Sequence, residues 1–164
     1  MSARDPSKKP PPSLKAVAIR LLARREYARA ELGERLAARG ASRDEAARVL
    51  DELERAGYLS DARFAQALVA QKAGQYGKRA IAHALKEKRV DATAAADALQ
   101  SLGPVDELAE ATALWQRRFG TAPRDEREKA RQVRYLLSRG YSMSIAFKVL
   151  RRAGAADVDD SAPG

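Results

Sequence analysis

The side chains that most often do chemistry in enzymes are scarce in this sequence. It contains no cysteine, which excludes a thiolate nucleophile, a disulfide framework and a zinc knuckle. The single histidine, His83, falls outside the apolar stripe of Ile81 and Leu85, so we expect an exposed side chain. Acidic residues stand three or four positions from arginines, which is typical of surface pairing, and no GxxxxGKS/T phosphate loop occurs. We therefore predict a protein that is not an enzyme and uses no metal or cofactor.

Positive charge is the chemical feature that remains. The chain carries 31 lysines and arginines against 22 aspartates and glutamates, a formal charge of +9. The excess belongs to the middle of the chain, because the residues from Ala155 onward are acidic. A body this basic indicates a polyanionic partner, nucleic acid first among them. The alternative is a solvated helix surface rich in Glu–Arg pairs.

Some of the cations recur at a regular interval. Arg29, Lys78 and Lys129 are separated by 49 and 51 residues, and each is predicted to stand at the start of a helix. A positive side chain there opposes the helix dipole at a cost of ~0.3–1 kcal/mol, whereas phosphates or carboxylates of a partner would suit it. We therefore predict a basic binding stripe. Its candidate residues are Arg24, Arg25, Arg29, Lys78, Arg79, Lys88, Arg89, Lys129, Arg131 and Arg139.

Two local motifs invite a nucleic-acid interpretation of their own. The segment 74–77 resembles the GXXG clamp of KH domains, but a KH domain needs a three-stranded sheet, and nothing nearby alternates like a strand. A flexible turn between helices is therefore favoured.

Trp115 and Phe119 stand four positions apart on a predicted helix. Core packing is favoured there over a platform for stacked bases, since no basic–aromatic alternation surrounds them.

The elements that must position these residues repeat along the chain. Alanine, leucine, arginine and glutamate dominate and only 5% of the residues are aromatic, which favours helices over sheet. Leu36, Leu85 and Leu136 recur at the same intervals of 49 and 51, which is typical of a helical repeat array. The same register relates Leu50, Leu99 and Leu150; Arg39, Lys88 and Arg139; Ser42, Asp91 and Ser142; and Ala46, Ala95 and Ala146.

This periodicity predicts an all-α protein, a tandem array of three three-helix repeats. The repeats span residues 14–57, 60–102 and 104–153, between disordered tails at 1–12 and 155–164. A chain of this length can form several small units that share a continuous core. Because each unit buries little by itself, we expect the units to stack into an elongated, curved body.

Helix ends carry signals of their own. Gly40 is placed to end the second helix of the first repeat, and Ser42 is placed to cap the third. Asp61 is a candidate cap for the first helix of the second repeat. In the third repeat, Gly103-Pro104 is placed to open the first helix, and Pro123 suits the first turn of the next.

The second repeat departs from the other two at one helix end. It has Arg89 where the others have Gly40 and Gly140. Arginine adopts the left-handed conformation of such glycines less readily, so we expect a weaker or less regular helix end there.

Four segments together resemble the RecX family, bacterial regulators of the RecA recombinase. They are 24–32, 57–65, 76–81 and 136–142, which follow the family's motifs in order and spacing. The structural positions of this resemblance are Tyr27, Leu32, Leu36, Gly40, Tyr58, Asp61, Phe64, Gly77, Ile81, Leu85, Leu136 and Gly140. Ala28 stands where the family has serine, Ser60 where it has an acidic residue, and Arg89 where it has glycine.

The resemblance implies a crescent of three-helix repeats that lies along the groove of the RecA–DNA filament. By binding there, such a protein would restrain the recombinase, ATPase and co-protease activities of RecA without chemistry of its own. The partners would be the RecA filament and single- or double-stranded DNA, bound without sequence preference, and the protein would act as a monomer. The lack of an apolar run near the ~20 residues that span a bilayer, and of a signal-peptide core, predicts a cytoplasmic location and no membrane partner.

A DNA-binding transcription factor of the helix-turn-helix type is the competing interpretation. The segment 46–59 resembles the recognition helix of winged-helix repressors. A winged helix would next need a β-hairpin, whereas residues 61–68 are predicted to start another helix. Sequence-specific operator binding is therefore less favoured than non-specific affinity for DNA.

Overall fold

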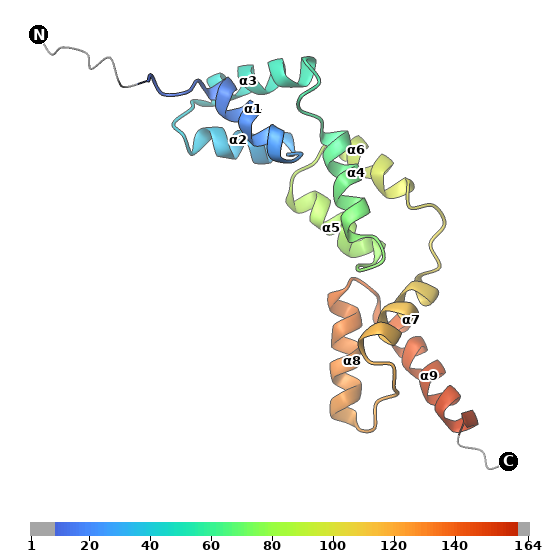
Figure 1. Cartoon of the computed structure of the whole chain (residues 1–164). Coiled ribbons are helices and arrows are strands. Elements are labelled where there is room, and N and C mark those ends of the chain that lie inside the picture. Colours follow the sequence, from blue (N-terminus) through green and yellow to red (C-terminus); the bar gives the residue numbers. More distant parts are fainter. Residues whose placement is uncertain (1–8, 161–164) are drawn as a thin grey trace, which may run out of the picture.

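The protein is all-α, and its helices follow one another in three groups of three along an elongated, curved body (Figure 1). The computed structural model describes residues 9–160. The two ends of the described chain lie at opposite ends of the body. The first repeat contains α1 (Leu14–Arg24), α2 (Arg29–Ala37) and α3 (Arg43–Arg55); the second contains α4 (Asp61–Lys72), α5 (Lys78–Glu87) and α6 (Ala92–Gln100); the third contains α7 (Glu107–Arg118), α8 (Glu126–Ser138) and α9 (Met143–Asp160).

Each repeat has a hydrophobic core of its own. The buried apolar residues of the described chain form three separate clusters, one per repeat, rather than the continuous core that the sequence allowed. The helix pairs that pack closely also lie within one repeat. The largest fully buried side chains of the described chain are Leu32, Leu36 and Leu53 in the first repeat, Ile81 and Leu85 in the second, and Leu136 and Val149 in the third. The repeats therefore meet through loops and helix ends.

Most of the apolar motif positions lie in these cores. Tyr27 and Phe64 are buried together with the leucines and the isoleucine of the motif set. Tyr58 is the exception, because its side chain is 54% exposed. The apolar character of a position therefore predicted burial at the helix stripes but not in the turn after α3.

The repeated polar position caps the third helix of every repeat. The side chains of Ser42, Asp91 and Ser142 each accept a hydrogen bond from the backbone N–H three residues later, at 3.1, 3.1 and 3.2 Å. Such caps satisfy donors that have no partner inside the helix. The prediction that Ser42 caps its helix is confirmed.

Other predicted helix starts are wrong by one to three residues. Ser60, not Asp61, caps α4, which leaves the Asp61 carboxylate available for other partners. Asp106 caps α7 and Asp125 caps α8. Gly103-Pro104 and Pro123 therefore lie in the loops before these helices. Both helices begin after the aspartate whose side-chain oxygen accepts a backbone N–H, and not at the preceding proline, whose fixed φ also suits a helix start.

The second helix ends in the same way in all three repeats. Gly40 and Gly140 have φ of 90° and 93°, and Arg89 has a φ of 52°, the only positive φ of a non-glycine residue in the described chain. In each repeat the residue after this position donates its N–H to the leucine carbonyl five residues earlier, at 3.2 Å. The expectation of a less regular end at Arg89 is therefore wrong. The arginine adopts the left-handed conformation at a cost of roughly 1–2 kcal/mol, and the hydrogen bond is kept.

The chain ends differ from the expected tails. Helix α9 runs to Asp160, so residues 155–160 are helical where a disordered tail was expected. Residues 9–12 precede the first helix, while the remaining parts of the predicted tails, 1–8 and 161–164, lie outside the described residues. None of the described helices is long and apolar enough to span a bilayer.

Candidate nucleic-acid interface

Several of the predicted binding cations lie at the junction between the first and second repeats, where they are paired. Arg25 contacts the Glu31 carboxylate at 2.6 Å, and Lys88 approaches the same carboxylate at 3.6 Å. Arg89 pairs with Glu34. The hydrogen bond to Glu31 raises the pKa of Arg25. Partial burial of Glu31 by itself would raise the pKa of its carboxyl, but the contacts with Arg25 and Lys88 outweigh that effect and hold the pKa below its usual value. Much of this positive charge is therefore neutralised within the protein.

Asp61 joins the two repeats through its carboxylate. One oxygen accepts the backbone N–H of Arg29 at 2.7 Å, and the other accepts the backbone N–H of Asp91 at 2.9 Å. These donors belong to the first residue of α2 and to the cap residue of α6. Asp61, which was expected to cap α4, thus connects the start of α2 to the start of α6. A second ion pair, Arg63 to Glu26 at 2.9 Å, crosses the same junction.

The predicted position at the start of a second helix is confirmed for Arg29 and Lys78 and is wrong for Lys129. The guanidinium of Arg29 pairs with Asp51 and Glu54 of α3 at 2.8 and 3.1 Å. Lys129 lies one turn inside α8, because that helix begins at Glu126 behind the Asp125 cap. Lys78 does begin its helix, and its side chain is exposed. Each of the three cations stands seven residues before the recurring leucine, so the sequence does not reveal that α8 begins three residues before Lys129.

The junction between the second and third repeats is built from backbone. Gly77 donates its N–H to the carbonyl of Arg139 at 2.6 Å, and Arg117 donates to the carbonyl of Gly74 at 2.8 Å. The backbone of Gly140 lies against Ala80, so close that a Cβ on Gly140 would stand 2.4 Å from the Ala80 Cβ. The GXXG segment is therefore a turn onto which the third repeat packs. It is not a free nucleic-acid clamp, and the turn interpretation is confirmed.

Beside this junction, aromatic rings and cations alternate. Three rings each have two cations within 6 Å of their centroids, and neighbouring rings share a cation. We call these seven residues the cation–aromatic ladder; in spatial order they are Lys72, Tyr76, Arg139, Tyr135, Arg118, Phe119 and Arg131. The successive distances from cation to ring centroid are 4.5, 4.6, 5.3, 5.9, 5.5 and 5.8 Å. Each such contact contributes about 0.5–1 kcal/mol at a partly exposed site.

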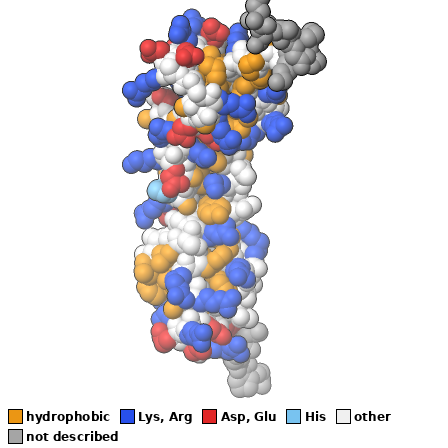
Figure 2. Space-filling model, turned by 90° about the vertical axis from the view of Figure 1, so that its left-hand side faces the viewer, with side chains coloured by type: hydrophobic (Ala, Val, Ile, Leu, Met, Phe, Trp, Pro, Cys, Tyr) orange, Lys and Arg blue, Asp and Glu red, His pale blue; other side chains and the backbone are white. Residues whose placement is uncertain are grey.

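The ladder cations differ from those of the first junction in their partners. None of the four forms an ion pair with a carboxylate of the described chain, and all four side chains are exposed or half-buried. The rings of Phe119 and Tyr135 also meet edge to face, with centroids 5.4 Å apart, which fixes the centre of the ladder. On the face of the molecule shown in Figure 2, Lys and Arg side chains adjoin hydrophobic ones over the lower half of the body.

The ladder contains residues that the sequence did not single out as binding residues. Lys72, Arg118 and Tyr135 were not among the candidates, and Phe119 was assigned to the core, where it is in fact half-buried. Arg131 and Arg139 were candidates and belong to the ladder. The alternation joins the stretches 72–76, 118–119 and 131–139, and its order in space is not their order in the sequence, so no short window of the sequence displays it.

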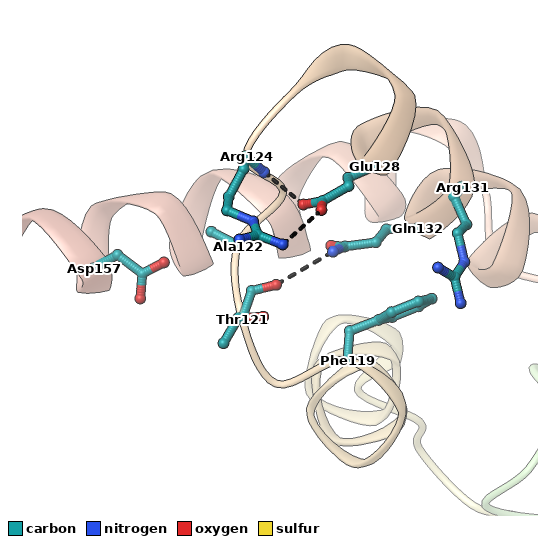
Figure 3. A pocket seen from close by; sticks show the side chains of 8 residues that line it. All are labelled: Phe119, Thr121, Ala122, Arg124, Glu128, Arg131, Gln132 and Asp157. Atoms are coloured by element: carbon teal, nitrogen blue, oxygen red, sulfur yellow. Dashed lines mark hydrogen bonds and ion pairs between the residues drawn. The ribbon is translucent and has the colours of Figure 1, made fainter.

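A hollow of about 550 Å³ opens at one end of the ladder (Figure 3). The Phe119 ring and the Arg131 guanidinium line it together with Gln132, whose amide oxygen accepts the indole N–H of Trp115 at 2.7 Å. Trp115 itself is buried, which confirms its assignment to the core. Arg124 pairs with Glu128 across the hollow at 3.2 Å. Its polar groups largely bind one another, so the exposed ladder offers more unpaired charge than the hollow does.

His83 is exposed, as predicted, and its imidazole lies 3.0 Å from Glu87. No group of histidine, aspartate and glutamate side chains among the described residues could hold a metal ion. The remaining candidates, Arg24 and Arg79, are exposed on the surface of the first and second repeats.

Comparison with known proteins relates the whole folded chain to one family. Models of the first, second and third three-helix domains of RecX match residues 15–53, 60–99 and 105–150. The regulatory protein RecX of Leptothrix cholodnii is 43% identical over 147 residues, which cover 90% of this chain and 93% of that protein. The corresponding protein of Ralstonia nicotianae is 39% identical and covers 93% and 96%.

The fold is also found in solved structures. A crystal structure of RecX from Lactobacillus salivarius superposes with a TM-score of 0.66 at 18% sequence identity, over 87% of this chain and 95% of that one. The family's three domains match in order, and the relatives are matched over nearly their full length. This chain belongs to the RecX family.

Proposed function

We propose that this protein binds the RecA–DNA filament and, by binding, restrains the recombinase, ATPase and co-protease activities of RecA. The observation that carries the proposal is the match of all three repeats, in order, to the three domains of the RecX family. Its relatives of 39–43% identity are regulatory proteins named RecX. The protein acts as a cytoplasmic monomer in this proposal and contributes no catalytic group.

The shape and charge of the molecule suit such a partner. A body of three successive repeats can contact several neighbouring subunits of a filament at once, because each repeat presents its own surface along the axis. The formal charge of +9 favours association with DNA and with acidic surfaces, and it raises the association rate at low ionic strength. DNA contacts through exposed arginines and lysines would be largely independent of base sequence.

The test is RecA-catalysed ATP hydrolysis and strand exchange on single-stranded DNA, with and without this protein. We expect both to fall at stoichiometric or lower amounts of the protein. No effect at those amounts would overturn the proposal. K78E/R79E reverses two exposed predicted binding cations, and it should weaken the inhibition and its dependence on salt. R35E/R43E makes the same charge change on the exposed surface of the first repeat and serves as the control.

The competing transcription-factor function predicts a different result in the same experiments. Tight binding to one duplex sequence, without an effect on RecA, would favour it. The described chain gives this function little support, because α4 follows α3 directly and no β-hairpin stands beside the candidate recognition helix. If this function were correct, exposed side chains of α3 would contact the edges of bases in the major groove.

A further inference from the structure

The cation–aromatic ladder holds its positive charges by a different means from the junction between the first and second repeats. At the first junction, the Arg25 guanidinium lies 3.6 Å from the Tyr27 ring centroid, but it also forms an ion pair with Glu31, which neutralises its charge. In the ladder the cations lie against rings, and no described carboxylate forms an ion pair with them; Arg139 also donates a hydrogen bond to the uncharged carbonyl of Gln75 at 3.4 Å. A ring orients a guanidinium without neutralising it, so the full charge stays available to an external anion.

The arrangement gathers like charges that repel one another. Arg118 and Arg139 both lie within 6 Å of the Tyr135 centroid, and Arg118 and Arg131 both lie within 6 Å of the Phe119 centroid. Neighbouring cations therefore lie within about 12 Å of each other, and the Debye length at physiological ionic strength is about 8 Å, so their repulsion is only partly screened. An anion placed along the ladder would relieve that repulsion at several cations together. A chain of phosphates fits this requirement better than a single small anion.

The three rings of the ladder indicate which kind of polyanion it binds. Tyr76, Tyr135 and Phe119 are half-buried, so each keeps part of its surface in contact with solvent. Bases stack on aromatic side chains and on guanidinium planes when their faces are uncovered, which is the case in a single strand but not inside a duplex. Regular alternation of cation and ring matches the alternation of phosphate and base along one strand.

We propose that the cation–aromatic ladder is a binding surface for single-stranded DNA. Lys72, Arg118, Arg131 and Arg139 contact successive phosphates, and the bases stack on the guanidinium planes and the exposed parts of the rings. The surface combines residues of the second and third repeats and exists only because the Gly77–Gly140 junction brings them together. The proposal deepens the proposed function and rests on it for the choice of DNA among polyanions.

The test measures fluorescence anisotropy of a labelled oligo-dT and of a labelled hairpin duplex with the full-length protein. R118Q/R131Q removes two exposed ladder charges and should weaken oligo-dT binding about tenfold. The slope of log affinity against log salt should fall by about 1.4, because each phosphate contact on a single strand accounts for about 0.7. R35Q/R43Q removes the same charge from the first repeat and should change the affinity less than twofold.

A second variant separates stacking from charge. Y135L keeps an apolar side chain at the centre of the ladder but removes the ring shared by Arg118 and Arg139. It should weaken oligo-dT binding several-fold and leave the duplex affinity nearly unchanged. Circular dichroism and thermal melting of each variant show whether the helices are kept. If Y135L is misfolded, the comparison of R118Q/R131Q with R35Q/R43Q still decides the proposal.

Each result of these measurements either supports or overturns the ladder as a binding surface for single-stranded DNA. Equal losses for R118Q/R131Q and R35Q/R43Q, or no loss for either, would overturn the ladder as a site. Equal losses of affinity for both DNA probes in Y135L would show that the ladder does not distinguish a single strand from a duplex, and would overturn the single-strand proposal. Weaker inhibition of RecA by R118Q/R131Q with unchanged oligo-dT binding would make the ladder a protein contact and also overturn it. Loss of oligo-dT binding by R118Q/R131Q, in a protein that leaves RecA unaffected, would support the ladder and contradict only the proposed function.

Discussion

The junction between the first and second repeats is held by carboxylates, whereas the junction between the second and third is held by backbone contacts at glycines. At the first, Asp61 accepts two backbone N–H groups, and ion pairs surround it. At the second, Gly77 donates to the Arg139 carbonyl, and Gly140 packs against Ala80 without room for a side chain.

These two kinds of contact respond to different conditions. Ion pairs of exposed side chains weaken as salt rises and as carboxylates become protonated. Close packing of backbone on backbone is insensitive to salt and pH, but it tolerates no added volume. We therefore expect the first junction to adjust its geometry with conditions and the second to stay fixed, which keeps the cation–aromatic ladder intact.

The largest expected effect is at the glycine of the second junction. G140A should destabilise the protein by about 2–4 kcal/mol, because the new Cβ would overlap Ala80 and the φ of 93° disfavours any side chain. G40A is the matched control in the first repeat, with a φ of 90° and nothing within 4 Å of the added Cβ, and it should cost about 1–2 kcal/mol. Urea denaturation gives both values.

A companion variant tests the steric cause. A80G/G140A removes the Cβ that would stand 2.4 Å away and should recover part of the loss. Amide hydrogen exchange should show that the protection lost in G140A lies in the segment 74–80. Equal destabilisation by G140A and G40A would mean that the close contact at the second junction contributes nothing.

The next effect is at the carboxylate of the first junction. D61A leaves the backbone N–H groups of Arg29 and Asp91 without their acceptor and should cost about 2 kcal/mol. D61N keeps one good acceptor and should fall between D61A and the wild type. D44A removes an acidic residue from the first turn of α3, where no described partner depends on it, and should cost about 0.5 kcal/mol. Thermal melting that ranks D44A equal to D61A would contradict the connecting role.

A smaller effect is expected at Glu31, whose side chain is 11% exposed and whose carboxylate contacts Arg25 and Lys88. E31Q should cost about 1 kcal/mol at pH 7. Because the pKa of Glu31 lies below 4.5 in the folded protein, its stabilisation is complete above that pH and is lost as the pH falls through the folded value. The difference in melting temperature between the wild type and E31Q should therefore shrink below pH 4.5. A difference that stayed constant down to pH 3 would exclude the charge of Glu31 as its cause.

The smallest effect has the opposite sign. R89G relieves the positive φ of Arg89 but loses the exposed pair with Glu34, so the net gain should be about 0.5–1 kcal/mol. R39G, the same substitution one position before Gly40 where the φ is not positive, should destabilise by roughly 0.5–1 kcal/mol. A loss of stability in R89G would show that the pair with Glu34 outweighs the strain and that charge dominates the first junction.

The fold was predictable to the extent that it depends on local patterns. The recurrence of Leu36, Leu85 and Leu136 revealed three repeats, and all three leucines are fully buried. The cap at Ser42 and the left-handed turn at Gly40 also follow from residue type alone. Helix starts before α7 and α8 were predicted less well, because proline and aspartate offered competing signals within a few residues.

The candidate site was less predictable, because a charge in the sequence does not disclose its partner. Arg29 and Lys129 have equivalent sequence positions, yet one pairs with two carboxylates of α3 and the other lies 5.5 Å from the Phe147 ring. Arg118 and Tyr135 drew no attention in the sequence. They become neighbours only when α7 and α8 pack together.

The helices, the three repeats and the net positive charge could be read from the sequence, because helical periodicity and caps act over a few residues and composition sums over the whole chain. Which charges are paired with carboxylates and which are not depends on how the helices pack. That packing placed Asp61 between two helix starts and fitted the Gly140 backbone against Ala80. It also assembled the ladder from separate stretches. Those outcomes depend on distances of a few ångströms between residues far apart in the chain, which only the packed repeats define.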